Sequence, residues 1–183
     1  MTHGGQTSLD RLVTSVARQA LERFLAEGRL PAPDPRRLPP APGLPEQAGV
    51  FVSLHDREGH LRGCVGTFLP TRPSLWEEIA VNAVAAATQD PRFPPVRPEE
   101  LADLRIKVDI LTPPEPVTSP DELDPKRYGV LVTDGERRGL LLPDIPGVES
   151  VAQQLAIARQ KAGIEPDAPV EIFRFAVRRF EET

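Results

Sequence analysis

The stretch of sequence that decides the fold is Phe51-Val-Ser-Leu-His-Asp-Arg-Glu-Gly-His-Leu-Arg-Gly-Cys-Val-Gly-Thr-Phe68. Two apolar and β-branched runs flank the turn-forming cluster Asp56-Arg57-Glu58-Gly59, which predicts a β-hairpin. Side chains alternate along a strand, so the hairpin has two faces. With a loop of either two or four residues, the polar face carries Ser53, His55, His60, Arg62 and Cys64. The apolar face carries Val50, Val52, Leu54, Leu61, Gly63 and Val65.

Segments with helical periodicity lie on both sides of this hairpin. Apolar residues recur every three or four positions over residues 8–27, and Gly28 is a natural end to that helix. Ser74-Leu-Trp-Glu77 is a capping box that predicts a helix from about 75 to 89, ended by Pro91. A short helix near 98–103 and a longer one over 150–162 complete the set.

Further strands are predicted over 104–111, 128–133, 138–142 and 170–180, and the middle two form a second hairpin about Asp134-Gly135. Hairpins are too frequent for a doubly wound parallel sheet. We therefore predict an α+β fold with a mostly antiparallel sheet flanked by helices, and no internal repeat. Residues 8–180 are expected to form one domain. Its proline-rich loop at about 31–47 either wraps the surface or forms a flap.

Composition and charge exclude several classes of function. The chain has 183 residues and a formal net charge of −5, which argues against a nucleic-acid binder. A single cysteine excludes an internal disulfide and a multi-cysteine zinc site. No apolar run approaches the roughly 20 residues of a membrane span, and the N-terminus lacks a signal peptide's apolar region. We expect a cytoplasmic protein without membrane contact, metal centre or cofactor.

The run Leu61-Arg-Gly-Cys-Val-Gly66 resembles the signature of the AMMECR-type domain family, which is LRGC, an aliphatic residue and glycine. The likeness covers nearly the whole chain in the right order. It continues through Glu78-Ile-Ala-Val-Asn-Ala83, Asp90-Pro-Arg-Phe-Pro-Pro95, Val108-Asp-Ile-Leu111, Tyr128-Gly-Val130, Arg138-Gly-Leu-Leu-Leu-Pro143 and Gln153–Ile164. The resemblance implies an α+β fold of two unequal lobes and a function that is poorly settled.

The resemblance also implies partners. Such domains commonly accompany a Memo-like protein and a radical-SAM enzyme, in a three-part set called the AmmeMemoRadiSam system. This chain resembles the stand-alone first member of that set. It has one cysteine and so lacks the three-cysteine cluster motif of the radical-SAM component.

Cys64 is the candidate nucleophile. Arg62, His55 and His60 share its predicted face, and a nearby Arg or protonated His lowers the pKa of a thiol. The alternative is that Cys64 is a small buried hydrophobic residue. Gly63 and Gly66 bracket it, and glycines within a strand mark close approach of a ligand, a helix or other backbone.

The remaining candidates are binding residues. Arg62 and Arg92 suit an anion because a guanidinium presents a rigid fork of donors. The structural alternatives are an ion pair of Arg62 with Asp90, and capping of the preceding helix by Arg92. Asn82 either faces the polar side of the hairpin or satisfies a buried backbone group, and we favour the second. The predicted binding set is Arg62, Gly63, Gly66, Asn82, Asp90 and Arg92.

The two hairpin histidines have no assigned role. His55, His60 and Asp56 give at most three metal ligands, and we favour solvent-exposed histidines over a metal site.

Two functional hypotheses follow from these residues. The first is an accessory or substrate-handling component that acts with Memo-like and radical-SAM proteins, and binds a small anionic molecule or a partner segment beside Leu61–Gly66. The alternative is an enzyme that uses Cys64 as nucleophile and His55 or His60 as base. A nucleic-acid-related role is the weakest of the three because the net charge is negative.

Overall fold

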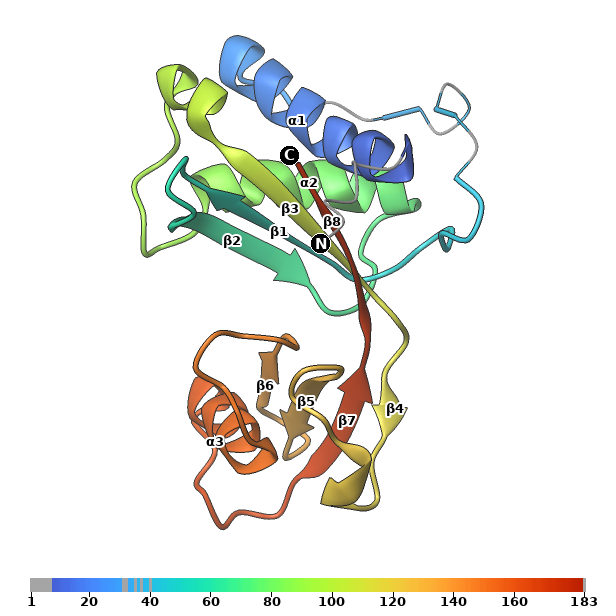
Figure 1. Cartoon of the computed structure of the whole chain (residues 1–183), viewed down its shortest axis with the longest axis vertical. Helices are drawn as coiled ribbons and strands as arrows, with labels where there is room; N and C mark the ends of the chain where they lie inside the picture. The colour runs from blue at the N-terminus through green and yellow to red at the C-terminus, as the bar shows by residue number, and fades with distance from the viewer. Residues whose placement is uncertain (1–7, 31–32, 35, 37, 40, 183) are drawn as a thin grey trace, which may run out of the picture. The chain divides into compact units, whose positions relative to one another are not determined.

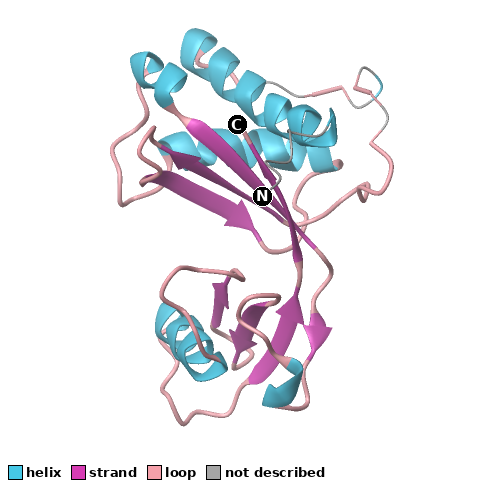
Figure 2. Ribbon diagram, in the orientation of Figure 1, coloured by secondary structure: helices cyan, strands magenta, loops and turns pink. Residues whose placement is uncertain are grey.

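The structure is a computed structural model that describes residues 8–30, 33–34, 36, 38–39 and 41–182 (Figures 1 and 2). The chain divides into two compact units. Unit 1 runs to Ile110 and takes in the chain again from Arg179, and unit 2 is Leu111–Arg178. Each unit contains one four-stranded sheet and helices, which confirms the predicted α+β class. None of the described helices is long and apolar enough to cross a membrane.

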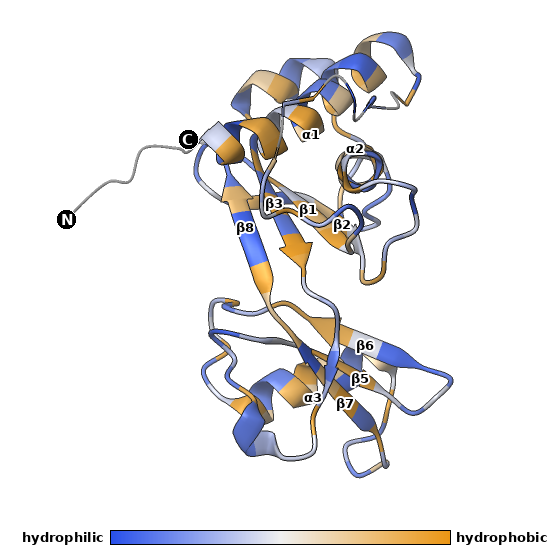
Figure 3. Cartoon of the chain, turned by 90° about the vertical axis from the view of Figure 1, so that its right-hand side faces the viewer, coloured by the Kyte–Doolittle hydropathy of each residue, from blue (hydrophilic) through white to orange (hydrophobic). Residues whose placement is uncertain are grey.

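Unit 1 is built on a sheet of strand order β2-β1-β3-β8. The strands are β1 (Val50–His55), β2 (Leu61–Thr67), β3 (Arg105–Leu111) and β8 (Val177–Glu181). The helices are α1 (Ser8–Glu27), α2 (Leu75–Thr88) and the short 3-10 helix η2 (Pro98–Asp103). Helix α2 packs on β1 and β2, and α1 packs on α2, so both helices lie on one side of the sheet (Figure 3).

The predicted two-faced pattern of the first strand is confirmed. Val50, Val52 and Leu54 are fully buried in the core beneath the helices, whereas Phe51, Ser53 and His55 are only partly buried. A sheet covered by helices on one face requires this alternation, since side chains point to opposite faces in turn. The polar side chains of β1, Ser53 and His55, therefore lie on the face of the sheet opposite α2.

The hairpin register differs from both predicted alternatives near the turn. Ser53 lies opposite Cys64, as a tight turn requires, but His55 lies opposite Leu61 because the register shifts between Leu54 and His55. Arg62 is the extra residue in this β-bulge, and a bulge re-aims the side chains beside it. A four-residue loop would pair His55 with His60 and a two-residue turn would pair it with Arg62, so both predicted pairings of His55 are wrong.

Described residues of the proline-rich loop lie against unit 1. Leu38 and Leu44 pack on its apolar core, and the Glu46 carbonyl accepts a 2.7 Å hydrogen bond from the Leu75 backbone N–H. Gln47 Nε2 donates to the carbonyl of Arg72, just before α2. These contacts correspond to a loop that wraps the surface.

Unit 2 is built on a sheet of strand order β4-β7-β5-β6. The strands are β4 (Glu115–Pro116), β5 (Gly129–Thr133), β6 (Arg138–Leu141) and β7 (Glu171–Phe175), with the 3-10 helix η3 (Pro120–Glu122). Helix α3 (Val151–Ala162) packs on β5 and β6. The sequence predicts the second hairpin and α3, but not β4 and η3 within the proline-rich connection.

The predicted last strand is two strands. The run 170–180 breaks at Ala176, so that β7 joins the sheet of unit 2 and β8 joins the sheet of unit 1. At the break, Ala176 N–H donates to Thr112 Oγ1 and Ala176 O accepts from Thr112 N–H, at 2.9 Å each. The pattern of apolar residues cannot reveal a strand that changes its partner, because the alternation continues through the break.

The two units contain the same hairpin–helix element. A Cβ on Gly63 would lie 2.1 Å from the Ala86 carbonyl oxygen of α2, and one on Gly139 would lie 1.9 Å from that of Ala158 in α3. Each glycine thus lets a helix approach the second strand of its hairpin. The spacing from this glycine to the helix-capping serine, Ser74 or Ser150, is also the same.

The equivalence extends into the two helices. Glu78 and Gln154 occupy the same position after the capping serine, and both are buried. In each unit a side-chain amide from the helix donates to a carbonyl at the start of the hairpin. Asn82 Nδ2 lies 3.2 Å from Val50 O, and Gln154 Nε2 lies 2.8 Å from the Tyr128 carbonyl. The sequence alone does not reveal this repeat, because packing contacts and caps define it rather than a run of identical residues.

Candidate functional site

Cys64 lies on an edge strand whose outer side is capped by a side chain. Strand β2 ends the sheet, and the Cys64 backbone N–H donates to Asp90 Oδ2 at 2.9 Å. Because this N–H points away from β1, Ser53 and Cys64 form a non-hydrogen-bonded pair, in which side chains approach most closely. The Cys64 side chain is partly buried and forms no disulfide.

Asp90 fastens the loop after α2 to this edge. Its side chain is 3% exposed and accepts from Arg92 Nη2 at 2.7 Å, from Arg92 Nε at 2.9 Å and from the Cys64 N–H. The hydrogen bonds from Arg92 are the largest cause that holds the pKa of Asp90 well below its usual range, and the Cys64 and Arg92 backbone N–H groups add to them. Asp90 and Arg92 of the predicted binding set therefore lie at the same strand edge as Cys64.

The contribution of Asp90 to the free energy of unfolding should depend on pH and be lost in acid. A carboxyl whose folded pKa is depressed stabilises the fold above its unfolded pKa of about 3.9, and this contribution is lost as pH falls. Asp90→Asn is expected to cost about 1–3 kcal/mol in urea unfolding at pH 7. The difference from the native protein should shrink between about pH 5 and pH 2.

The control for this experiment is Glu99→Gln, which alters an exposed carboxyl in η2 and should leave the urea midpoint unchanged at every pH. A pH-independent gap between Asp90→Asn and the native protein would show that the charge of Asp90 is not what stabilises the edge.

Arg62 is enclosed by the segment that follows α2. Its Nε and Nη2 bind the Glu100 carboxylate at 2.9 and 3.2 Å, and its Nη1 donates to the Pro94 carbonyl at 2.9 Å. The side chain is 16% exposed. The predicted alternative pair of Arg62 with Asp90 is wrong, because Asp90 binds Arg92 instead. Anion binding by Arg62 stays a prediction.

Arg92 is the more accessible of the two arginines. Its side chain is 58% exposed, and its guanidinium binds Asp90 rather than the helix carbonyls that one alternative predicts. The hydrogen bond to Asp90 is the main cause that raises the pKa of Arg92, and the charge of the Cys64 thiolate contributes. Cys64 therefore lies beside the Asp90–Arg92 ion pair rather than beside an isolated cation.

The two glycines of the signature are explained by packing. Gly63 faces the backbone of α2 at Ala86. A Cβ on Gly66 would lie 2.3 Å from the Phe51 ring and 2.6 Å from Val50 O. The sequence left open whether a ligand, a helix or other backbone approaches these glycines. The helix explains Gly63, and the Phe51 ring and the Val50 backbone explain Gly66. Their predicted contact with a ligand stays a prediction.

Asn82 takes the structural role that we favoured. It is 2% exposed, and its Nδ2 bonds Val50 O and Thr67 Oγ1 at 3.2 Å each. Beside it lies Glu78, a 1% exposed carboxylate that the sequence-based set missed. Two adjacent glutamates open α2, and the second falls on its buried side, which is the signal that marks Glu78.

The structure separates the two hairpin histidines. His55 Nε2 lies 3.1 Å from Ser53 Oγ, and its Nδ1 lies 3.2 Å from Gly59 O. His60 instead contacts Asp56, with Nδ1 3.1 Å from Oδ2. Only His55 is thus joined to the strand residue that faces Cys64. Ser53 is a further residue missing from the predicted set.

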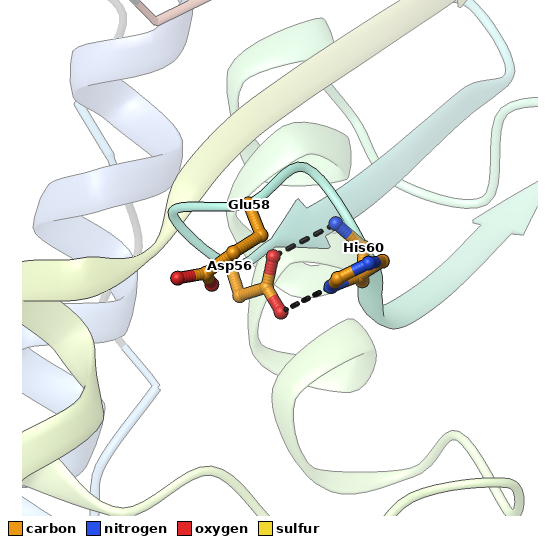
Figure 4. Close-up of side chains that lie close together, drawn as sticks. All are labelled: Asp56, Glu58 and His60. Carbon is orange, nitrogen blue, oxygen red and sulfur yellow. Dashed lines mark hydrogen bonds and ion pairs between the residues drawn. The ribbon is translucent and has the colours of Figure 1, made fainter.

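The turn of the hairpin brings together Asp56, Glu58 and His60, whose potential ligand atoms lie within 4.8 Å of one another (Figure 4). Glu58 is the third member of this group, in place of the predicted His55. The group could hold a metal ion, but His60 is 77% exposed and Asp56 already accepts from both the backbone and the ring of His60. We propose no metal site here, because exposed groups of this kind are common without an ion.

Comparison with known proteins identifies the family. The AMMECR1 family model matches residues 14–180. The chain belongs to the AMMECR1 family. The crystal structure of the uncharacterised protein PH0010 from Pyrococcus horikoshii is similar, with a TM-score of 0.86 and 34% identity over 97% of this chain and 93% of that one.

Two relatives show how this AMMECR1 domain occurs. A protein from Thermotoga maritima is 56% identical over 164 residues, which are 89% of this chain and 93% of the relative. A protein from Clostridium acetobutylicum, CA_C1420, is 48% identical over 135 residues, which are 74% of this chain and only 28% of the relative. The domain therefore also occurs within a longer polypeptide.

Proposed function

We propose that this AMMECR1 protein is a cytoplasmic accessory component that acts with Memo-like and radical-SAM proteins, and presents an anion-binding site to a small molecule or a partner segment. The observation that carries the proposal is that Arg92 is both oriented by a buried carboxylate and exposed to solvent. Asp90 orients its guanidinium at 2.7 and 2.9 Å, yet the side chain stays 58% exposed beside Cys64. A guanidinium that is already oriented loses little freedom when it binds a carboxylate or phosphate.

The partner half of the proposal has separate support. The resemblance of the chain to the stand-alone member of a three-part set favours association with the other two members. The Clostridium relative shows only that such a domain can be joined to further polypeptide in one chain. Domains joined in one chain in one organism are reasonable partners as separate chains in another.

Affinity purification from a native host that expresses the Memo-like and radical-SAM genes is the test. The tagged protein is expected to recover at least one of these two proteins. Arg92→Gln should reduce the recovery about tenfold or more if the cation takes part in a desolvated contact. The matched control is Arg23→Gln, which alters an exposed arginine of α1. Repeated failure to recover either protein would contradict the proposal.

Nucleophilic chemistry at Cys64 is the second candidate function. The specific observation that favours it is that Arg92 Nη2 and the Cys64 backbone N–H donate to the same oxygen, Asp90 Oδ2, which keeps the guanidinium close to Cys64. A cation beside a thiol favours the reactive thiolate. Of the two histidines, His55 is the better candidate base, since it is joined to Ser53 directly across from Cys64. The site at which an electrophile labels the protein separates this function from binding alone.

A further inference from the structure

A serine and a histidine on the hairpin have the geometry of a nucleophile and its base. Ser53 Oγ lies 3.1 Å from His55 Nε2, and both residues are partly exposed. We propose that Ser53 is a nucleophile activated by His55, and that it transfers the acyl group of a small anionic ester to water. The inference depends on β1, the hairpin turn and the neighbouring strand β3, and not on Arg92 or on any partner.

The hydrogen bonds of the neutral imidazole fix the direction of proton transfer. His55 Nδ1 lies 3.2 Å from the Gly59 carbonyl oxygen, which can only accept. The ring proton is therefore on Nδ1, and Nε2 carries the lone pair. Ser53 must then donate its hydroxyl proton to Nε2, which is the polarity that a general base requires. The Gly59 carbonyl takes the orienting role that a third group plays in nucleophile–base pairs.

The neighbouring strand supplies positive charge. On β3, Lys107 lies opposite Ser53, and Arg105 lies opposite His55. Lys107 forms a 3.3 Å ion pair with Glu181, whereas Arg105 is exposed and donates to its neighbouring carbonyl, that of Leu104, at 3.4 Å. Because a basic residue holds the register position opposite each member of the pair, we expect the substrate to be an ester that carries a carboxylate.

The chemical steps balance with water as the only co-reactant. Ser53 Oγ attacks the ester carbonyl carbon while its proton passes to His55 Nε2. The tetrahedral oxyanion collapses, the bond to the alcohol oxygen breaks, and His55 returns the proton to the departing alcohol. Water then attacks the acyl-serine and gives a proton to His55. The bond to Ser53 Oγ breaks, that oxygen takes the proton back, and the carboxylic acid leaves.

Labelling with a fluorophosphonate tests the nucleophile on the whole chain. Ser53 Oγ should bond to phosphorus with loss of fluoride, and mass spectrometry should map the adduct to Ser53. Ser53→Ala should abolish the adduct, and His55→Asn should slow labelling about 100-fold. The matched control is His60→Asn, which alters the hairpin histidine that binds Asp56 and should label at the native rate. Unchanged circular dichroism and urea midpoints establish that each variant is folded.

Ester hydrolysis tests the substrate class. The mono-p-nitrophenyl ester of succinate should be hydrolysed about tenfold faster than p-nitrophenyl acetate, and Arg105→Gln should remove this preference. Several results would overturn the proposal: no adduct at Ser53 in folded protein, an adduct on Cys64 instead, or a labelling rate that His55→Asn leaves unchanged. None of these results bears on the recovery of Memo-like or radical-SAM proteins, so the two proposals fail separately.

Discussion

Gly63→Ala is expected to destabilise the protein by about 3 kcal/mol or more in urea unfolding followed by circular dichroism. The added Cβ would lie 2.1 Å from the carbonyl oxygen of Ala86. That oxygen belongs to the backbone of α2, so it cannot rotate away as a side chain would. Either the helix moves off β2, which opens the core of unit 1, or the strand bends at its centre.

The control substitution is Gly59→Ala in the hairpin turn. Gly59 has a φ of +87°, but a Cβ there would meet nothing within 4 Å beyond its chain neighbours, so only backbone strain of about 1–2 kcal/mol is expected. Gly139→Ala, the equivalent change in unit 2, should be as damaging as Gly63→Ala because its contact with Ala158 O is 1.9 Å. A native urea midpoint for Gly63→Ala would mean that α2 is not held against the strand.

Glu78→Met is expected to cost about 3–5 kcal/mol, because it leaves several buried donors without an acceptor. The Glu78 carboxylate accepts five hydrogen bonds, two of them from the backbone N–H groups of Thr71 and Arg72 at 2.7 and 2.8 Å. The others come from Thr67, from the Thr71 hydroxyl and from Asn82. These bonds hold the loop between β2 and α2 in place. The variant should therefore unfold at a lower urea concentration than the native protein.

Two further variants make the result specific. Glu78→Gln should lower the free energy of unfolding by only about 1–2 kcal/mol. Its amide oxygen can serve the two backbone N–H groups and the threonine hydroxyls can rotate to accept, so that only the weak 3.4 Å bond from Asn82 Nδ2 is lost. Gln154→Met, at the equivalent position of α3, should cost about 1 kcal/mol or less. It loses one bond to Tyr128 O and removes a buried Oε1 that has no hydrogen-bond partner among the described residues. Equal costs for Glu78→Met and Gln154→Met would contradict this account.

Local signals in the sequence predict most elements of this fold. Ser74 caps α2 by accepting from the Glu77 backbone N–H, as predicted, and Gly163 ends α3 in the left-handed conformation. The alternation along β1 predicts its buried face. Each of these signals acts over a few residues, which is why a single sequence can reveal it. Thr7 and Asp10 together also predict a capping box at the start of α1, but Thr7 lies outside the described residues.

The sequence predicted which residues lie near one another in the candidate site better than it predicted which of them form hydrogen bonds. Asp90, Arg92 and Cys64 meet as expected, but the partner of Arg62 is Glu100, far along the chain, rather than Asp90. Ser53 and Glu78 were not in the predicted set. Their importance depends on which donor or acceptor lies opposite, and a side chain's partner across strands depends on the register.

The sequence by itself determined the α+β class, the ends of most helices and the two faces of the first strand, because periodicity, caps and turn residues act locally. The family was recognised from the resemblance carried by Leu61–Gly66 and the motifs that follow it. Only the tertiary structure decided the bulge at Arg62, the division of the last strand between two sheets, and the pairing of His55 with Ser53. Each of these depends on contacts between segments distant in the chain or on a one-residue choice of register. Local preference leaves such choices nearly equal in free energy, and packing then selects one.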